Sequence, residues 1–351
     1  MRRPCGTFDT SYGQDLSIIK TRFQWIMTIL GAVLLFVVLP LTGNVSILSK
    51  VNIMAITIIA ALGLNILTGY CGQLNFGHAA FVAVGAYIST ILISHLQWPW
   101  LATVPFAAFG TALIGLIFGL PSLRIKGFYI AVTTLAAFFV IMFIIKHGGS
   151  LTGGINGLTV GAINIFGIAI DDERKFFFLI MGFLVLMTFF AKNIVRGKVG
   201  RAFIAVRDND IAAEMMGINI FKYKLIAFCI CSAFAGVAGS LFAAYYGSVS
   251  TGQFTFGECI WYIGFIIVGG MGSITGTFFG VIFLKSIDFF VTSIGPSMSS
   301  ALPGLGSQSI SSIMLIMFGL VIILFLIFEP RGLYHRWELL KASIRFWPLT
   351  Y

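Results

Sequence analysis

The stretch Gly69-Tyr-Cys-Gly-Gln-Leu-Asn-Phe-Gly-His-Ala-Ala-Phe81 joins two long apolar runs, 51–69 and 76–94. Each run approaches the about 20 residues that a helix needs to cross a bilayer. The joining stretch carries glycines that permit a break in the backbone, and it offers three polar side chains: Gln73, Asn75 and His78. Irregular backbone at membrane depth is tolerated only inside protein or beside a water-filled cavity. We therefore expect a broken helix on a solute pathway; the alternative is a tight turn at the cytoplasmic surface with His78 as a capping residue.

The composition is that of a membrane protein. Hydrophobic residues make up 58% of the chain and charged residues 10%, and the mean hydropathy is +1.01. A soluble domain could not bury that much apolar surface. We expect an all-α polytopic integral membrane protein of about ten transmembrane helices, in which the eighth segment is short and broken or re-entrant. The ten apolar segments are 25–42, 51–69, 76–94, 100–120, 128–146, 176–192, 225–245, 258–271, 273–293 and 310–328.

The distribution of basic residues predicts the orientation, because Lys and Arg near span ends stay on the cytoplasmic side. With the N-terminus inside, most of the 22 basic residues fall there, so both termini are predicted to be cytoplasmic. The net charge of +10 is then explained by topology and contact with membrane lipid, and it requires no nucleic-acid partner. The five cysteines include no C-x-x-C pair and predict no metal site. The expected parts are a cytoplasmic segment 1–24, a membrane domain 25–328 and a cytoplasmic tail 329–351.

Residues 193–224 form a hydrophilic island in this apolar chain. Its charged residues are Arg196, Lys198, Arg201, Arg207, Asp208, Asp210, Glu214, Lys222 and Lys224. Within it we expect a short helix, with Asp208 or Asp210 as its N-cap and Gly217 as its stop. Ile211, Met215 and Ile218 would share one apolar stripe opposite Glu214. Such a helix suits a groove of a soluble partner; the alternative is a helix lying on the bilayer surface.

Other polar residues lie inside apolar spans. Asn65, Thr133 and Thr134 either face a pore or bond across a helix interface. Lys285 and Asp288 are spaced for an ion pair on one helix face, which lowers the cost of placing charge in the membrane. The spans carry no chain of Asp, Glu and His typical of an ion-coupled carrier. Transport energy must then come from elsewhere, unless the protein is a passive channel.

Six motifs, in order along nearly the whole chain after the first span, resemble the LivM-type inner-membrane permease subunits of branched-chain amino acid ABC importers. They are Gly72-Gln-Leu-Asn-Phe-Gly-His-Ala79, Pro121-Ser-Leu-Arg-Ile-Lys-Gly-Phe-Tyr129, Leu151-Thr-Gly-Gly-Ile-Asn-Gly-Leu158, Gly200–Asn209 continued by Ala213–Asn219, Gly269-Gly-Met-Gly-Ser-Ile-Thr-Gly276 and Glu329-Pro-Arg-Gly-Leu333. The segment 1–24 matches no motif of this family.

The resemblance implies the partners of this chain. These are a LivH-like second permease, two cytoplasmic LivG- and LivF-like ATPases that bind ATP and Mg, and a solute-binding protein outside the bacterial inner membrane. It also implies that residues around 201–219 form the helix that couples to the ATPases, with these candidate residues: Arg201, Arg207, Asp208, Ile211, Glu214, Met215 and Gly217. The chain itself lacks a phosphate-binding loop, since its nearest approach, Gly280–Ser286, has Leu284 in place of the second glycine.

Two alternatives remain open at the level of sequence. Urea-type permeases share much of the same pattern, so the transported solute is either a branched-chain amino acid (Leu, Ile or Val) or a small polar solute such as urea. An intramembrane hydrolase would pair His78 with Ser240 or Ser273, although neither serine lies in a G-x-S-x-G motif. The chain is thus expected to be a transport subunit rather than an enzyme.

Overall fold

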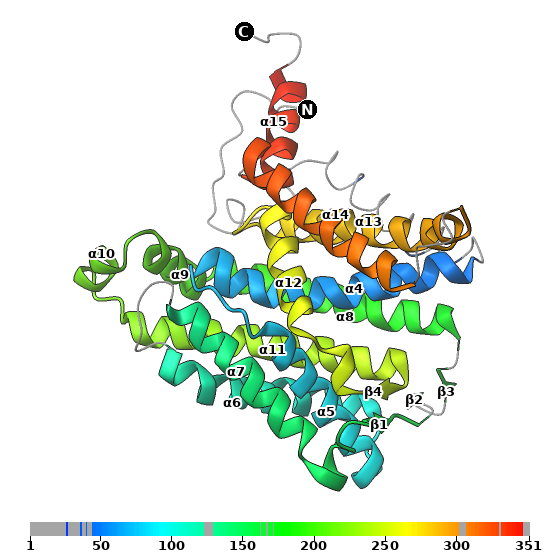
Figure 1. Cartoon of the computed structure of the whole chain (residues 1–351). Helices are drawn as coiled ribbons and strands as arrows, with labels where there is room; N and C mark the ends of the chain where they lie inside the picture. The colour runs from blue at the N-terminus through cyan, green and yellow to red at the C-terminus, as the bar shows by residue number, and fades with distance from the viewer. Residues whose placement is uncertain are drawn as a thin grey trace.

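The computed structural model describes residues 44–122, 129–161, 163–165, 168–170, 172–301, 307–329 and 331–346, together with Ile26, Phe36 and Pro40. It is almost entirely helical (Figure 1). The α-helices are α4 (Val45–Asn65), α5 (His78–Leu96), α6 (Trp100–Ser122), α7 (Tyr129–Lys146), α8 (Glu173–Arg196), α9 (Lys198–Asp208), α10 (Asp210–Met215), α11 (Ile220–Tyr246), α12 (Phe256–Gly269), α13 (Ile274–Ala301), α14 (Ser307–Phe328) and α15 (Gly332–Phe346).

Short elements complete the chain at the helix ends. A π-helix, Ile66–Tyr70, continues α4, and single 3₁₀ turns lie at Gly149–Leu151 and Thr251–Gln253. Strand β1 (Leu158–Thr159) pairs antiparallel with β4 (Ser248–Val249), so that Leu158 lies opposite Val249. Strands β2 (Asn164–Ile165) and β3 (Ile168–Ala169) form a small hairpin. The connector between α7 and α8 is thus tied to the segment that follows α11.

The observed helices confirm the all-α polytopic class. Within the described residues, eight helices are long and apolar enough to cross a membrane, and α14 covers the predicted tenth segment with 22 residues. The predicted first span, 25–42, lies outside the described residues apart from Ile26, Phe36 and Pro40. The predicted eighth segment is short: α12 has 14 residues, a length of about 21 Å at 1.5 Å per residue.

Helix α11 is the centre of the bundle. It packs against α4, α5 and α6, and α4 in turn packs against α8 and α13. Much of α4 and α11 is therefore buried, whereas α6, α7 and α8 present large apolar side chains outward, such as Phe109, Phe143 and Phe189. In a membrane this outward apolar surface faces lipid or a second subunit.

Glycines set the closest helix contacts. A Cβ at Gly85 of α5 would lie 2.5 Å from the Gly236 Cα of α11, and one at Gly236 would lie 2.6 Å from the Ala107 carbonyl oxygen of α6. Such approaches between backbones require a residue without a side chain. Glycines in apolar runs thus permit tight packing among α5, α6 and α11.

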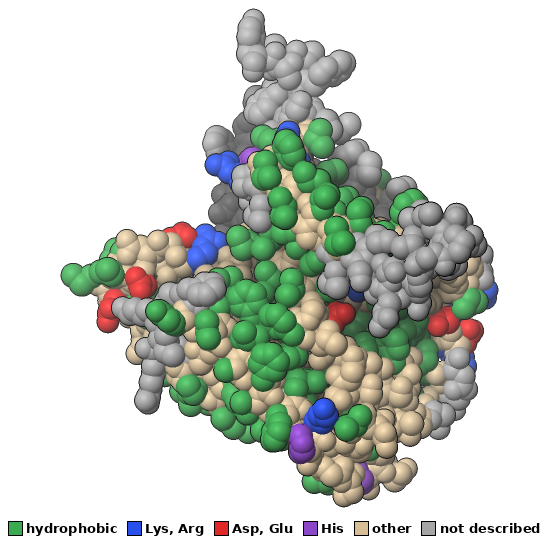
Figure 2. All heavy atoms as spheres, in the orientation of Figure 1, with side chains coloured by type: hydrophobic (Ala, Val, Ile, Leu, Met, Phe, Trp, Pro, Cys, Tyr) green, Lys and Arg blue, Asp and Glu red, His purple; other side chains and the backbone are tan. Residues whose placement is uncertain are grey.

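Charged side chains gather at both ends of the bundle. Helices α9 and α10 project at one end, and the β-strands lie at the opposite end (Figure 1). Figure 2 shows hydrophobic side chains over the middle of the visible face, while acidic and basic side chains gather over α9 and α10 and near the start of α8. An apolar belt between two polar ends is the surface expected of a chain that spans a bilayer.

A substitution can test the role of the glycine contact. We expect Gly85→Ala to lower the free energy of unfolding by about 1–3 kcal/mol, because the new methyl group would collide with backbone that cannot move aside. Gly182→Ala is the matched control: its Cβ would meet nothing within 4 Å, so it should leave stability unchanged or raise it through helix propensity. Thermal unfolding of the purified chain in detergent measures both, and equal melting temperatures would contradict the packing role.

Candidate functional site

The helix break after α4 is largely buried, with Gly72 and Leu74 exposed. The helix widens into the π-helix, where the Cys71 amide donates to the Ile66 carbonyl, and Gly72 then takes a φ of +75°. The polar groups of the following backbone are bonded within the chain: the Gln73 carbonyl accepts from Thr68 Oγ1 at 2.9 Å, and the Phe76 amide donates to Thr134 Oγ1 at 3.1 Å. The prediction of broken helices is confirmed here, and the break meets the condition for irregular backbone at membrane depth.

A second break faces the first. Residues 270–273 separate α12 from α13, with positive φ angles at Gly270 and Gly272. Asn65, at the end of α4, joins the two breaks: its Oδ1 accepts from the Gly272 amide at 3.0 Å. Its Nδ2 donates to the Ser273 carbonyl at 2.9 Å and to Thr277 Oγ1 at 2.8 Å. Asn65 is buried and its amide is fully used in this bridge, so in this conformation it offers no free group to a solute.

Arg207 of α9 reaches into the same junction. Its Nη1 donates to the Gly69 carbonyl at 2.9 Å, and a Cβ at Gly272 would lie 3.1 Å from that nitrogen. A Cβ at Gly72 would lie 2.9 Å from Arg207 Cγ, so the arginine stem packs over this glycine. Nε and Nη2 of Arg207 bond Asp208 Oδ1 at 2.9 and 2.8 Å. The guanidinium therefore ties the hydrophilic island to the π-helix that leads into the first break, through a charge-assisted hydrogen bond. It also lies close to Gly272 of the second break.

The polar residues of the first break have different surroundings. The Gln73 side chain is 3% exposed and neither of its amide atoms has a hydrogen-bond partner among the described residues. Asn75 Oδ1 accepts from the Gly77 amide at 2.8 Å, while its Nδ2 has no such partner. Buried amide groups without partners are costly. Gln73 and Asn75 are thus the two predicted pathway residues whose side chains keep free hydrogen-bonding capacity.

His78 and the two threonines are placed differently from Gln73. His78 is completely buried, and its ring bonds the Ala60 carbonyl at 2.9 Å and Cys231 Sγ at 3.5 Å. It begins α5 after the N-cap Gly77, so the interpretation of His78 as a surface capping residue is wrong. Thr134 bonds backbone within the break. Thr133 bonds the Tyr129 carbonyl on the exposed side of α7.

The two serines considered for a hydrolase are engaged elsewhere. Ser240 Oγ donates to Ser89 Oγ at 2.9 Å. Ser273 Oγ accepts from the Gly276 amide at 3.0 Å and contacts Thr275 Oγ1. His78 bonds Ala60 and Cys231 instead. Neither serine is paired with the histidine, so the geometry required for nucleophilic catalysis is missing.

The hydrophilic island is more helical than the sequence predicts. Besides α10, it contains the end of α8, all of α9 and the start of α11. The N-cap of α10 is Asn209, whose Oδ1 accepts from the Ala212 amide at 3.0 Å, so the choice of Asp208 or Asp210 is wrong; an asparagine caps equally well. Gly217 is confirmed as the stop, with a φ of +81° and the hydrogen bond from Ile218 N to the Ala213 carbonyl that closes such helix ends.

Helix α10 presents apolar side chains to the outside at the tip of the molecule. Ile211 is 71% exposed, Met215 85% and Met216 84%, whereas Ile218, the third member of the predicted stripe, packs against the core. Arg201 and Glu214 are also exposed. Exposed apolar side chains on a polar, projecting helix are typical of a surface that a partner covers.

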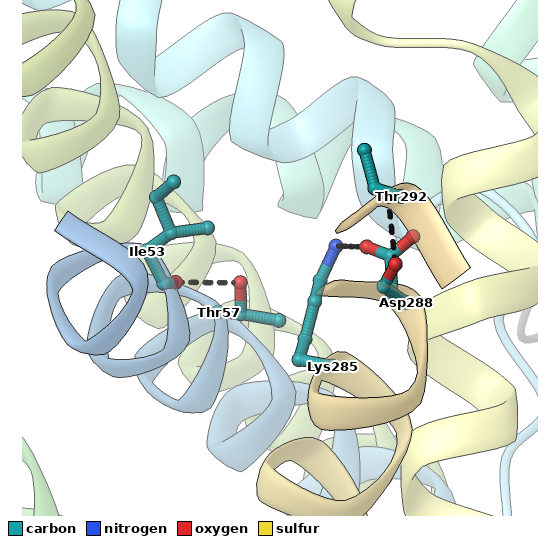
Figure 3. A network of polar contacts seen from close by, with 5 residues as sticks. All are labelled: Ile53, Thr57, Lys285, Asp288 and Thr292. Atoms are coloured by element: carbon teal, nitrogen blue, oxygen red, sulfur yellow. Dashed lines mark hydrogen bonds and ion pairs between the residues drawn. The ribbon is translucent and has the colours of Figure 1, made fainter. Parts of the chain in front are cut away.

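Lys285 and Asp288 form the ion pair that their spacing predicts. Lys285 Nζ lies 3.4 Å from Asp288 Oδ2, and both side chains are largely buried. Figure 3 shows this pair on α13 facing Thr57 of α4. The Thr57 hydroxyl donates a hydrogen bond to the Ile53 carbonyl at 2.8 Å. The ammonium also lies 5.6 Å from the centroid of the Trp261 ring, within the range of a cation–π interaction.

Several known proteins similar to this chain are named as permeases. A LivM permease protein of a high-affinity branched-chain amino acid transport system, from Salmonella typhimurium, is 34% identical over 242 residues, or 62% of this chain and 57% of that protein. The LivM protein of Escherichia coli gives the same figures. BraD of Pseudomonas aeruginosa, a permease protein of the same kind of system, is 27% identical over 311 residues, covering 80% of this chain and 92% of BraD. The chain thus spans a little over half of the length of the Salmonella typhimurium and Escherichia coli LivM proteins.

No solved structure matches the chain. A family model described as branched-chain amino acid transport system / permease component matches residues 46–326. This match runs from α4 into α14 and includes both helix breaks and the hydrophilic island. The chain therefore belongs to the family of permease components of branched-chain amino acid transport systems.

Proposed function

We propose that this chain is one permease subunit of an ATP-driven importer that carries branched-chain amino acids into a bacterial cytoplasm. Its partners are a second, LivH-like permease, two LivG- and LivF-like ATPases that bind ATP and Mg, and an extracytoplasmic solute-binding protein. The names of the related proteins support the transported solute, and the charge distribution supports an inner-membrane orientation with both termini inside.

One contact carries the proposal: the hydrogen bond from Arg207 to the Gly69 carbonyl. Helix α10, with its exposed Ile211 and Met215, would receive a cytoplasmic ATPase. Helix α9 directly precedes α10 in the chain, and Arg207 lies in the last turn of α9. A movement of α10 would therefore act through Arg207 on the break beside Gln73. This arrangement gives the protein a mechanical route from ATP hydrolysis to the solute pathway, and a passive channel would have no use for it.

Import is tested by uptake into proteoliposomes that contain the complete complex and its binding protein. We expect uptake of labelled leucine that stops when ATP is omitted. Uptake of labelled urea in place of leucine would retain the architecture and replace the solute. Flux that persists without ATP would instead favour a channel.

The docking role of α10 is tested by the double substitution Ile211→Asp and Met215→Asp. Burying each new carboxylate against an apolar groove is unfavourable, so the ATPases should no longer copurify with the permeases. Ile155→Asp is the matched control, because Ile155 is 70% exposed at the opposite end of the bundle. Copurification at the normal ratio in the double variant would remove α10 from the docking surface.

The coupling role of Arg207 is tested by Arg207→Met, which keeps an unbranched side chain over Gly72 and removes the hydrogen bond to Gly69. A hydrogen bond to a charged group contributes about 1.5–3 kcal/mol, so uptake per ATP hydrolysed should fall about tenfold or more while the ATPases remain bound. Lys198→Met removes the same charge from an exposed position of α9 and should leave the ratio unchanged. An unchanged ratio in both variants would disprove the coupling route.

The pathway role of Gln73 is tested by Gln73→Met. Uptake should fall, yet the melting temperature of the complex should not, because the Gln73 amide has no hydrogen bond to lose in the described part of the chain. Asn65→Leu is the comparison variant for a structural residue. It removes three hydrogen bonds and should therefore lower the melting temperature. Normal uptake by Gln73→Met would place the pathway elsewhere.

A further inference from the structure

A cavity of about 230 Å³ lies between α4, α5, α11, α12 and α13. This space far exceeds the about 10–15 Å³ that one ordered water requires and falls just below the about 300–1,000 Å³ of sites for drug-sized ligands. Ile53 and Thr57 line it from α4, at roughly 12 and 18 Å from the first residue of that helix, from 1.5 Å per residue. The cavity therefore lies at membrane depth and has the size for one small solute.

Most of the wall is apolar. Ile53 and Ile56 of α4, Val82 of α5 and Phe242 of α11 line one part of it, and Phe254 lies beside them just before α12. These branched and aromatic side chains offer no hydrogen bonds. They suit an aliphatic side chain, while Thr57, Tyr246 and Gln253 add polar groups to the same wall.

Two charged residues face the same cavity from neighbouring helices. Glu258 belongs to the first turn of α12 and Lys285 to α13. Among the described residues, no group donates a hydrogen bond to the Glu258 carboxylate. Lys285 makes one hydrogen bond, a long one of 3.4 Å to Asp288, and an ammonium has three donors. A carboxylate and an ammonium with unused bonding capacity at membrane depth are costly unless a ligand meets them.

We propose that this cavity binds the amino acid during translocation, with the substrate ammonium on Glu258 and the substrate carboxylate on Lys285. The aliphatic side chain then lies against Ile56 and Phe242. This assignment rests on the proposed import function and explains how the chain selects a zwitterion with an apolar side chain. The sequence separates the two charged residues by about seven turns of helix and a break, so that only the packing of α12 against α13 brings them to one site.

The cavity ends at the helix break. Tyr262 lines its floor, and the Tyr262 ring meets the His78 ring edge to face, with centroids 5.1 Å apart. Ala79, the residue after His78, also lines the floor. Gln73 and Asn75 precede His78 by five and three residues in the chain. The Tyr262–His78 ring contact thus links the wall of the cavity to the start of α5, where the first break ends.

The test measures binding of labelled leucine to the complete complex in nanodiscs without the binding protein, alongside ATP-driven uptake by the same preparation. We expect saturable leucine binding that weakens about tenfold or more in Glu258→Gln and in Lys285→Met, since each loses a charge-assisted contact. Glu173→Gln is the control, because Glu173 is a partly buried carboxylate already bonded to Asn52 and Tyr245.

Ligands that lack one charge separate a direct contact from a structural effect. 4-Methylpentanoate has no ammonium, so it should bind wild type about tenfold or more weakly than leucine does, and the difference should largely vanish in Glu258→Gln. Leucinamide, which lacks the carboxylate, should show the same pattern with Lys285→Met. A merely structural role would leave the ligand preference unchanged.

Failure of this assignment is distinguishable from failure of the import function. The cavity assignment alone would be overturned if wild type takes up leucine normally and Glu258→Gln binds leucine as tightly as wild type. It would also be overturned if the loss of affinity caused by Glu258→Gln and the loss caused by removing the ligand's ammonium are additive. The same holds if wild type takes up leucine but shows no saturable binding. Wild-type uptake of urea without leucine would overturn the solute on which the assignment rests.

Discussion

The structure depends on satisfying backbone polar groups where the membrane helices are interrupted. Inside a bilayer, each unpaired N–H or C=O costs several kcal/mol, so a break survives only if other parts of the protein supply its partners. Here the neighbouring helices supply partners to the two breaks, 71–77 and 270–273. Asn65 bonds the second break from the end of α4, and Thr134 bonds the first from α7. The breaks are therefore fixed parts of the fold rather than loops at its edge.

This solution places a basic residue of the hydrophilic island at the junction. The Gly69 carbonyl, where the π-helix nears its end, accepts its hydrogen bond from Arg207. The same helix–break junction is consequently shared by the membrane core and by the helices that project from it. Arg207 can reach this junction because Gly72 and Gly272 have no side chains, which leaves room for the guanidinium and its stem. The coupling route proposed for ATP hydrolysis follows from this one crowded contact.

The cavity lies on the other side of the same junction. Its floor, Tyr262 against His78, closes on the start of α5, and His78 is in turn held by Ala60 and Cys231. The helix proposed to dock the ATPases, the two breaks and the proposed binding cavity are thus linked by contacts of Arg207, Asn65 and the Tyr262–His78 ring pair. An alternating-access cycle needs such links, since a change at the docking end must open or close the space that holds the solute.

The sequence by itself determined the membrane class, the approximate helix bounds, the island and the presence of a break near Gly72, because these follow from local composition and residue spacing. It also placed the Lys285–Asp288 pair, whose partners are one helical turn apart. It did not determine the inward direction of Arg207, the bridging role of Asn65 or the meeting of Glu258 with Lys285, since each depends on contacts between segments distant in the chain. Local spacing cannot show which polar side chains of a helix have found partners; the tertiary packing decided that Asn65 is satisfied and that Gln73, within the described part of the chain, is not.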